Sequence, residues 1–159
     1  MNPIKKLVAA ISAAFSIFSA YATVFYVTPD GTGSGSSWSD ATTLDALSAD
    51  LSNTKSTKVV AGDIIRMKAG TYTMTAMVDI KKPITVEGGY KGEVDDDLTL
   101  ADVPETVLEG AYNSAVKEPI YLTTASGTNY FHRLSFTRFY RRGFLKYGNA
   151  SLEMYNCRF

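Results

Sequence analysis

Apolar and polar residues alternate in short stretches along most of this chain, and each stretch ends at glycine, proline or another turn residue. Alternation with a period of two residues is typical of β-strands, whose successive side chains point to opposite faces. Several stretches follow one another too closely for helices to lie between them. We expect strands at 24–27, 64–68, 78–80, 84–86, 106–108 and 120–122.

One segment has the spacing of a helix instead. Leu44, Leu47 and Leu51 fall at positions i, i+3 and i+7, which places them on one face of a helix. The Ser-Asp pair at 39–40 supplies residues that are favourable at a helix N-cap. We therefore expect an amphipathic helix from 39 to 51.

Two pairs of similar segments indicate that the strands stack. Residues 86–88 and 108–110 share the order apolar, glutamate, glycine, and residues 134–139 and 154–159 both end in Arg-Phe. Strands this short are unstable alone, but strands stacked about 4.8 Å apart pair with neighbours on both sides. The pattern predicts a right-handed parallel β-helix whose open N-terminal end is capped by the helix. Because the last repeat runs to Phe159, we expect this β-helix to be truncated at its C-terminal end.

The segment 1–22 has the features of a secretory signal peptide. Two lysines precede an apolar run at 7–18, and Ala20-Tyr21-Ala22 matches the small-x-small pattern of a cleavage site. The apolar run is shorter than the roughly 20 residues that a membrane-spanning helix needs. We expect a mature chain without a transmembrane segment, in one β-helix domain at 23–159, with an N-terminal cap at 23–60 and the repeating turns at 61–159.

Composition narrows the class of protein further. The chain of 159 residues has 16 basic and 16 acidic side chains, and this balance does not favour nucleic acid as a partner. Cys157 is the only cysteine, which excludes an intramolecular disulfide. Hydrophobic residues make up 45% of the chain, as expected for a globular protein rather than a disordered one.

Five motifs follow one another along the first half of the chain: Tyr26-Val27 before a Gly/Ser loop, Ser-Trp-Ser-Asp-Ala at 37–41, Gly-Asp-Ile-Ile at 62–65, Ala-Gly-Thr-Tyr at 69–72 and Ile-Thr-Val-Glu-Gly-Gly-Tyr at 84–90. Together they resemble the start of secreted bacterial proteins with a right-handed parallel β-helix, the pectin-lyase-like fold. The similarity is to the N-terminal part of polymorphic outer-membrane proteins and Bacteroidetes surface proteins, and 152–159 is similar to their repeat motif. The resemblance implies an exported or cell-surface scaffold of a Gram-negative bacterium, often adhesive.

Acidic residues supply the candidate catalytic and metal sites. Glu87 and Glu109 share a position in the first repeat, so a β-helix would place them in neighbouring turns as a pair of carboxylates for glycoside hydrolysis. Each also directly precedes a glycine, where a surface acid is ordinary. Asp95, Asp96 and Asp97 offer the oxygen ligands that Ca²⁺ prefers, but acidic loops are usually only solvated. We expect no cofactor, with Ca²⁺ as the alternative.

The candidate binding residues lie where basic and aromatic residues interleave. Arginine and tyrosine dominate recognition surfaces and stack on ligands, although the same side chains also serve solubility on outward strand positions. His132, the only histidine, has no nucleophile at a recognisable spacing, and we expect an ordinary position for it. The candidate ligand-binding residues are Tyr130, Arg133, Arg138, Tyr140, Arg141 and Arg142.

These observations predict an exported, non-catalytic surface scaffold or adhesin that binds polysaccharide or a host or cell-surface protein. The alternative is a carbohydrate-active enzyme of the same fold, either a polysaccharide lyase or a glycoside hydrolase, or an N-terminal fragment of one. A partner at the C-terminal end of the stack is a further expectation.

Overall fold

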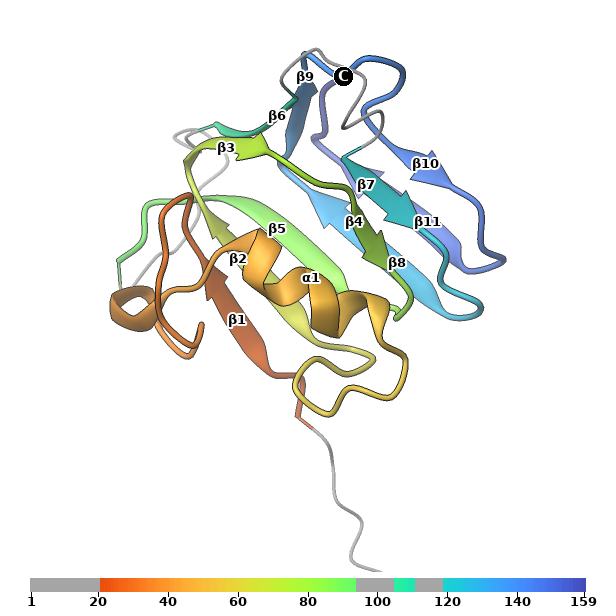
Figure 1. Cartoon of the computed structure of the whole chain (residues 1–159), viewed down its shortest axis with the longest axis horizontal. Coiled ribbons are helices and arrows are strands. Elements are labelled where there is room, and N and C mark those ends of the chain that lie inside the picture. Colours follow the sequence, from red (N-terminus) through yellow and green to blue (C-terminus); the bar gives the residue numbers. More distant parts are fainter. Residues whose placement is uncertain (1–20, 94–104, 111–118) are drawn as a thin grey trace, which may run out of the picture.

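The computed structural model describes residues 21–93, 105–110 and 119–159, and within these parts the chain is mostly β with one α-helix (Figure 1). The helix α1 spans Leu44–Ser52 and follows a short 3-10 turn, Trp38–Asp40. The strands are β1 (Val24–Val27), β2 (Ile64–Lys68), β3 (Gly70–Met74), β4 (Val78–Ile80), β5 (Thr85–Tyr90), β6 (Thr106–Gly110), β7 (Ile120–Leu122), β8 (Thr128–His132), β9 (Ser135–Thr137), β10 (Leu145–Lys146) and β11 (Ser151–Tyr155).

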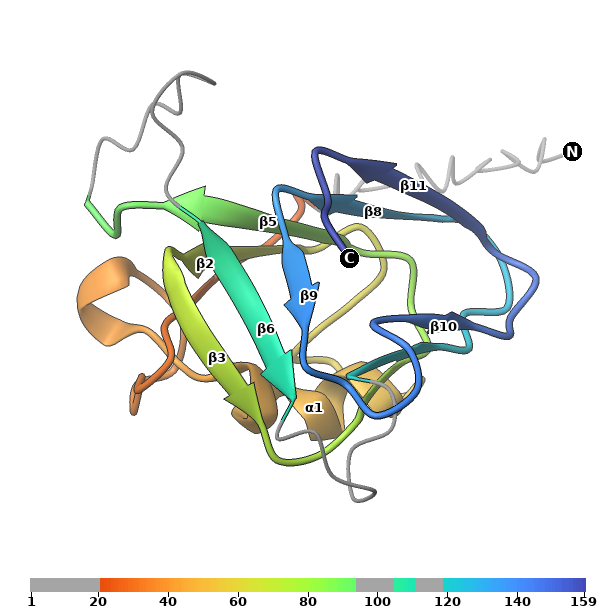
Figure 2. The ribbon, with the colours of Figure 1, turned by 90° about the horizontal axis from the view of Figure 1, so that it is seen from above.

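The strands form three separate parallel sheets. One sheet has five strands in the order β1-β2-β5-β8-β11, and the other two have three strands each, β10-β7-β4 and β3-β6-β9. Every pair of adjacent strands runs in the same direction. Seen from above, the sheets face one another around a shared interior (Figure 2).

Alternating side chains from these sheets fill that interior. In the five-stranded sheet, Ile65 pairs with Val86 and Val86 with Phe131, and all three are almost fully buried. Leu108 and Phe136 form an equivalent pair in the β3-β6-β9 sheet. Because apolar burial is the main favourable contribution to folding, these paired positions fix which face of each strand points inward.

The helix α1 completes the core beside the strands. Its Leu44, Leu47 and Leu51 are buried, as the sequence pattern predicted, and the helix packs against β4 at the edge of the β10-β7-β4 sheet. The hydroxyl of Thr43 accepts a hydrogen bond from the amide of Ala46 at 3.1 Å, so Thr43 is the N-cap. The predicted start at residues 39–40 is wrong by about one turn, because those residues form the 3-10 turn instead.

The prediction of a right-handed parallel β-helix with a capping helix is wrong. The described residues form a mostly β fold of parallel sheets with one helix, and no right-handed β-helix is shown. The repeats used for that prediction do not mark equivalent strands. Val86 lies in β5 of the five-stranded sheet, whereas Leu108 lies in β6 of another sheet. The segments containing Phe136 and Met154 are likewise in different sheets. Similar short sequences arise wherever a brief strand meets a turn, so local similarity did not determine pairing.

The fully buried ring of Phe131 packs edge to face on Phe144, with ring centroids 5.1 Å apart. Because Phe131→Ala leaves a cavity in the core, we expect it to lower the free energy of unfolding by about 3–5 kcal/mol. Urea unfolding followed by circular dichroism measures this. Tyr147→Ala is the matched control, since that ring is 79% exposed, and it should change stability by no more than about 0.5 kcal/mol. Equal effects of the two substitutions would contradict the assignment of the core.

Candidate functional site

The outer face of the five-stranded sheet carries one residue from each strand in a single line. Tyr26 of β1 pairs with Arg66 of β2, and Arg66 pairs with Glu87 of β5. Glu87 pairs with His132 of β8, and His132 with Tyr155 of β11. Since side chains alternate between the faces of a strand, these five lie opposite the buried residues. We call Tyr26, Arg66, Glu87, His132 and Tyr155 the cross-strand row.

Glu87 is at the centre of the row and has three polar neighbours. The hydroxyl of Tyr90 donates a hydrogen bond to its Oε2 at 2.5 Å. Arg66 Nε lies 3.6 Å from Oε2, and His132 Nδ1 lies 3.9 Å from Oε1. The last two distances are within ion-pair range but too long for hydrogen bonds. The Glu87 side chain is 19% exposed, so it is largely but not completely shielded from solvent.

The guanidinium groups of two arginines lie near the ring of Tyr90. Arg66 lies 5.2 Å and Arg133 5.6 Å from the centre of its ring, both within the range of cation–π attraction. Burial, and next the hydrogen bond to Glu87, raise the pKa of Tyr90 to about 12. The phenol is therefore neutral at physiological pH and acts as a hydrogen-bond donor to Glu87.

Local backbone geometry explains why these groups meet. The pairing of β2 with β5 shifts register between Arg66 and Lys68, so Lys68 stands opposite Tyr90. Arg133 has a positive φ of 57° directly after β8, and its Nε donates to the carbonyl of Gly88 at 2.8 Å. A Cβ at Gly88 would lie 2.4 Å from the carbonyl oxygen of Arg133, so only glycine permits this close approach.

Aromatic rings border the row at both ends. At one end, Tyr26 contacts Trp38 edge to face at 4.8 Å between centroids, and Trp38 lies 5.7 Å from Tyr90. At the other end, Tyr155 contacts His132 at 5.1 Å and is 51% exposed. Charged groups thus occupy the middle of the row and aromatic groups its ends.

Two nitrogen atoms in the row have unused hydrogen-bonding capacity. Arg66 Nε and His132 Nε2 are buried and have no hydrogen-bond partner among the residues that the structure describes. Such atoms are uncommon in folded proteins because leaving a buried polar group unpaired costs roughly 1–3 kcal/mol. The two residues that carry these nitrogens flank Glu87, so the polar groups at the centre of the row are only partly satisfied.

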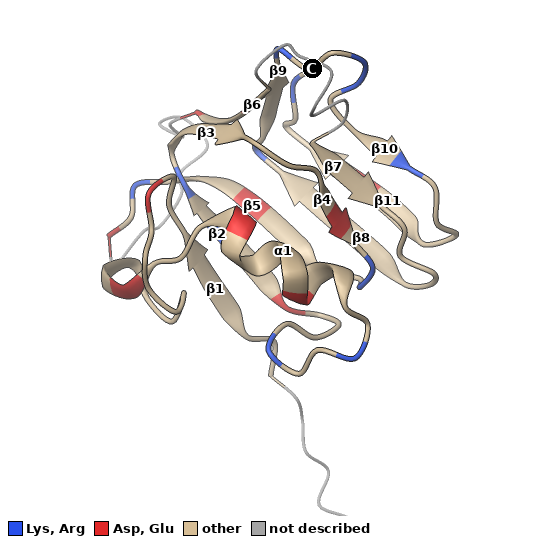
Figure 3. Ribbon diagram, in the orientation of Figure 1, with Lys and Arg blue, Asp and Glu red and all other residues tan. Residues whose placement is uncertain are grey.

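The six candidate ligand-binding residues from the sequence do not form one surface. Tyr130 lies beside the row, with its ring 6.3 Å from that of His132, and Arg133 contacts Tyr90. The other four, Arg138, Tyr140, Arg141 and Arg142, are exposed in the segment between β9 and β10. Arg138 there pairs with Glu109, with Nη1 and Oε1 3.1 Å apart. In Figure 3, acidic residues lie on α1 and at β4 and β5, whereas basic residues lie on the loop beside the C-terminus and at β10.

The predicted pairing of Glu87 with Glu109 is wrong. Glu87 pairs with Arg66 and His132 in the five-stranded sheet, whereas Glu109 pairs with Thr73 and Thr137 in the β3-β6-β9 sheet. The candidate Ca²⁺ ligands Asp95, Asp96 and Asp97 lie outside the described residues. Among the residues that are described, no three His, Cys, Asp or Glu side chains are placed to hold a metal ion.

Sequence reasoning missed Arg66, Tyr90 and His132 as members of one site. Alternation along β2 and β8 places Arg66 and His132 on outward positions, and that was the only available signal. Their meeting at Glu87 depends on pairing between strands that are far apart in the chain, and a single sequence does not reveal that register.

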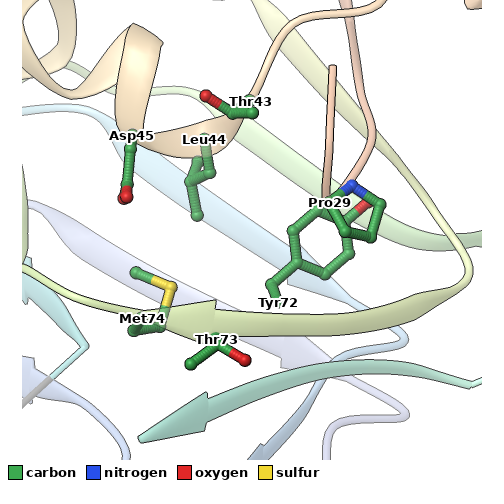
Figure 4. Close-up of a pocket in the computed structure, with 7 residues that line it drawn as sticks. All are labelled: Pro29, Thr43, Leu44, Asp45, Tyr72, Thr73 and Met74. Atoms are coloured by element: carbon green, nitrogen blue, oxygen red, sulfur yellow. The ribbon is translucent and has the colours of Figure 1, made fainter.

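A small hollow lies away from the row, between the start of α1, Pro29 and β3 (Figure 4). Its volume of about 90 Å³ is small beside the roughly 300–1,000 Å³ of ordinary ligand pockets. The Tyr72 hydroxyl at its edge is at donor distance from the carbonyls of Lys68 (2.8 Å) and Val27 (3.0 Å), and burial raises the pKa of this phenol. The hollow is therefore part of the helix packing rather than a binding site.

No protein-family model, curated protein or solved structure is significantly similar to this chain. The candidate site therefore rests on the geometry of the cross-strand row. No helix in the described part of the chain has the length and hydropathy to cross a bilayer.

We expect Tyr90→Phe to lose the hydrogen bond to Glu87 and to be about 1–3 kcal/mol less stable than the wild type at pH 8. The pKa of Tyr90 is about 12 in the folded protein, against the ordinary tyrosine value near 10 in the unfolded chain. The resulting stabilisation is fully present below pH 10 and is lost as the pH rises from about 10 to about 12. The variant should therefore lose less stability than the wild type between pH 8 and 11.

Urea unfolding at several pH values in this range measures both effects. Thr85→Ala, on the outer face of the same strand and without a titratable group, should keep the wild-type slope. A Tyr90→Phe variant with the same alkaline slope as the wild type would disprove the role given to the Tyr90 phenol.

Proposed function

We propose that this protein is an exported, non-catalytic module that binds polysaccharide across the cross-strand row. The observation that carries the proposal is the line of five paired side chains with aromatic rings at its ends and charged groups in its middle. Export is proposed from the signal-peptide pattern at 1–22. A role as a surface scaffold or adhesin follows if the bound polysaccharide belongs to another cell.

The dimensions of the row suit an extended ligand. Five strands separated by about 4.8 Å give a line of about 19 Å from Tyr26 to Tyr155. This length fits several linked sugar rings better than a single small molecule.

The chemistry of the row matches the two kinds of surface that a sugar ring presents. The C–H face of a sugar is apolar and packs on aromatic rings, which Tyr155 at one end and Tyr26 with Trp38 at the other provide. Sugar hydroxyls both donate and accept hydrogen bonds. Arg66 offers donors to them and Glu87 offers acceptors, and bonds to such charged groups are the stronger ones.

The proposal that the protein is not a glycoside hydrolase rests on the number of carboxyl groups in the cross-strand row. Glycoside hydrolysis by the usual mechanism uses two carboxyl groups that flank the bond to be broken. The row contains one, Glu87, and its nearest polar neighbours are Tyr90, Arg66 and His132. Glu109 belongs to another sheet and is ion-paired with Arg138. Binding is therefore the function that this geometry supports best.

The row is also well suited to binding because it is built on paired strands. Each residue of the row lies on a strand that is hydrogen-bonded to its neighbours, and Tyr90 further restricts Arg66 through its ring and Glu87 through its hydroxyl. Pre-ordering of this kind reduces the conformational entropy that a ligand must overcome on binding.

The test is a binding survey with wild-type protein against neutral and acidic polysaccharides, by sedimentation with insoluble polymers and calorimetry with soluble ones. Tyr155→Ala should weaken binding to any polymer that the wild type binds by about tenfold or more, because it removes an exposed ring at one end of the row. Tyr147→Ala is the matched control, since this ring is more exposed but lies outside the row.

Two further measurements separate the alternatives. Arg141→Ala/Arg142→Ala should bind like the wild type, and a loss of binding there would move the site to the segment between β9 and β10. Release of reducing sugar or of unsaturated product would contradict the non-catalytic proposal. Failure of the wild type to bind any polysaccharide in the survey, or equal binding by Tyr155→Ala and Tyr147→Ala, would contradict the proposed site.

A further inference from the structure

Asp63, directly before β2, is a fully buried carboxylate. Its Oδ1 accepts a hydrogen bond from the backbone nitrogen of Thr23 at 2.9 Å, and its Oδ2 accepts one from the nitrogen of Val60 at 2.7 Å. Among the described residues, no lysine, arginine or histidine forms an ion pair with it. A buried carboxylate is normally paired with a cation, so Asp63 lacks the partner that burial calls for.

The backbone nitrogen that Asp63 holds belongs to the residue at the predicted cleavage site. The pattern Ala20-Tyr21-Ala22 predicts that Thr23 becomes the first residue of the processed chain. Tyr21 is 89% exposed, and Ala22 and Thr23 are exposed as well, so the bond before Thr23 is accessible to a peptidase.

We infer that processing after Ala22 creates the missing cation, and that the new α-ammonium group of Thr23 forms an ion pair with Asp63. Hydrolysis of the Ala22–Thr23 bond consumes one water, leaving a carboxylate on Ala22 and an amine on Thr23 that takes up a proton near neutral pH. The nitrogen already lies 2.9 Å from Oδ1, so the pair forms without movement of the backbone. The inference rests on the predicted cleavage and is independent of polysaccharide binding.

The ion pair would fix the start of the five-stranded sheet. The carbonyl of Thr23 accepts from the nitrogen of Ile64 at 2.9 Å, and the carbonyl of Asp63 accepts from the nitrogen of Thr85 at 3.0 Å. These contacts join the first residues of β1, β2 and β5. Processing replaces a neutral amide donor with a charged ammonium group, which adds a direct attraction between opposite charges to the hydrogen bond with Asp63. The processed chain therefore holds β1 more firmly than the precursor does.

The test uses the full chain, expressed in an exporting host and purified after processing, with the N-terminus identified by mass spectrometry. The informative variant has one glycine inserted between Ala22 and Thr23. Its cleavage site is unchanged, but the ammonium group moves to the glycine and Thr23 keeps an uncharged amide that can still donate to Asp63. The ratio of folded to unfolded protein, from urea unfolding, should be about tenfold higher for the wild type than for this variant.

The same comparison in an Asp63→Asn background distinguishes an ion pair from a simple length effect. In the Asp63→Asn background, the inserted glycine should change the ratio by less than about twofold. Asp45→Asn is the matched control, because Asp45 is an exposed aspartate on α1, and in this background the tenfold difference should remain. If Asp63→Asn does not fold, acetylation of the Thr23 amino group of the processed wild type replaces it, because this removes the charge without lengthening the chain, and it should lower the ratio about tenfold. No loss of stability on acetylation would contradict the ion pair. An inserted glycine without effect in the wild type, or a mature N-terminus other than Thr23, would overturn the inference.

Discussion

The parallel register of the five-stranded sheet is the constraint on which both the core and the candidate site depend. Ile65, Val86 and Phe131 are paired on its inner side, and burying them determines which residues face outward. A shift of one residue in β2 or β5 would exchange the two faces of that strand and place Arg66 or Glu87 in the core. Burial of the apolar face therefore aligns three outward residues, Arg66, Glu87 and His132. The hydrogen bond from Tyr90 to Glu87 and the contacts of Arg66 and Arg133 with the Tyr90 ring add to this alignment.

The two ends of the first three strands of that sheet have different roles. At their starts, the carboxylate of Asp63 and the backbone groups around it join β1, β2 and β5. Further along, the register shift between Arg66 and Lys68 and the glycines of β5 let Tyr90 and Arg133 approach closely. The order at the starts is needed for the geometry of the row, because Tyr26 and Arg66 take their positions from β1 and β2. Processing and ligand binding would thus act on the same sheet at different places.

Period-two alternation was enough to predict where strands lie, and the strands expected at 24–27, 64–68, 78–80 and 120–122 coincide with β1, β2, β4 and β7. Leucine spacing likewise predicted α1. Pairing was not predictable, because the similarity of 86–88 to 108–110 reflects a strand ending at glycine and carries no information on partners. The site shows the same division: Glu87, Tyr130 and Arg133 were identified as candidates, but Glu87 was assigned the wrong partner and His132 an ordinary position. Only long-range register brings these residues together.

The register can be tested directly by disulfide formation. In a Cys157→Ala background, Thr85→Cys/Tyr130→Cys places two cysteines at paired positions of β5 and β8, close enough to form a disulfide on mild oxidation. Thr85→Cys/His132→Cys offsets one of them by two residues, beyond the roughly 7 Å limit for such a bond. The account predicts rapid cross-linking of the first pair and none of the second, seen as a mobility shift under non-reducing conditions. Cross-linking of the offset pair, or of neither pair, would contradict the register on which the core and the cross-strand row both depend.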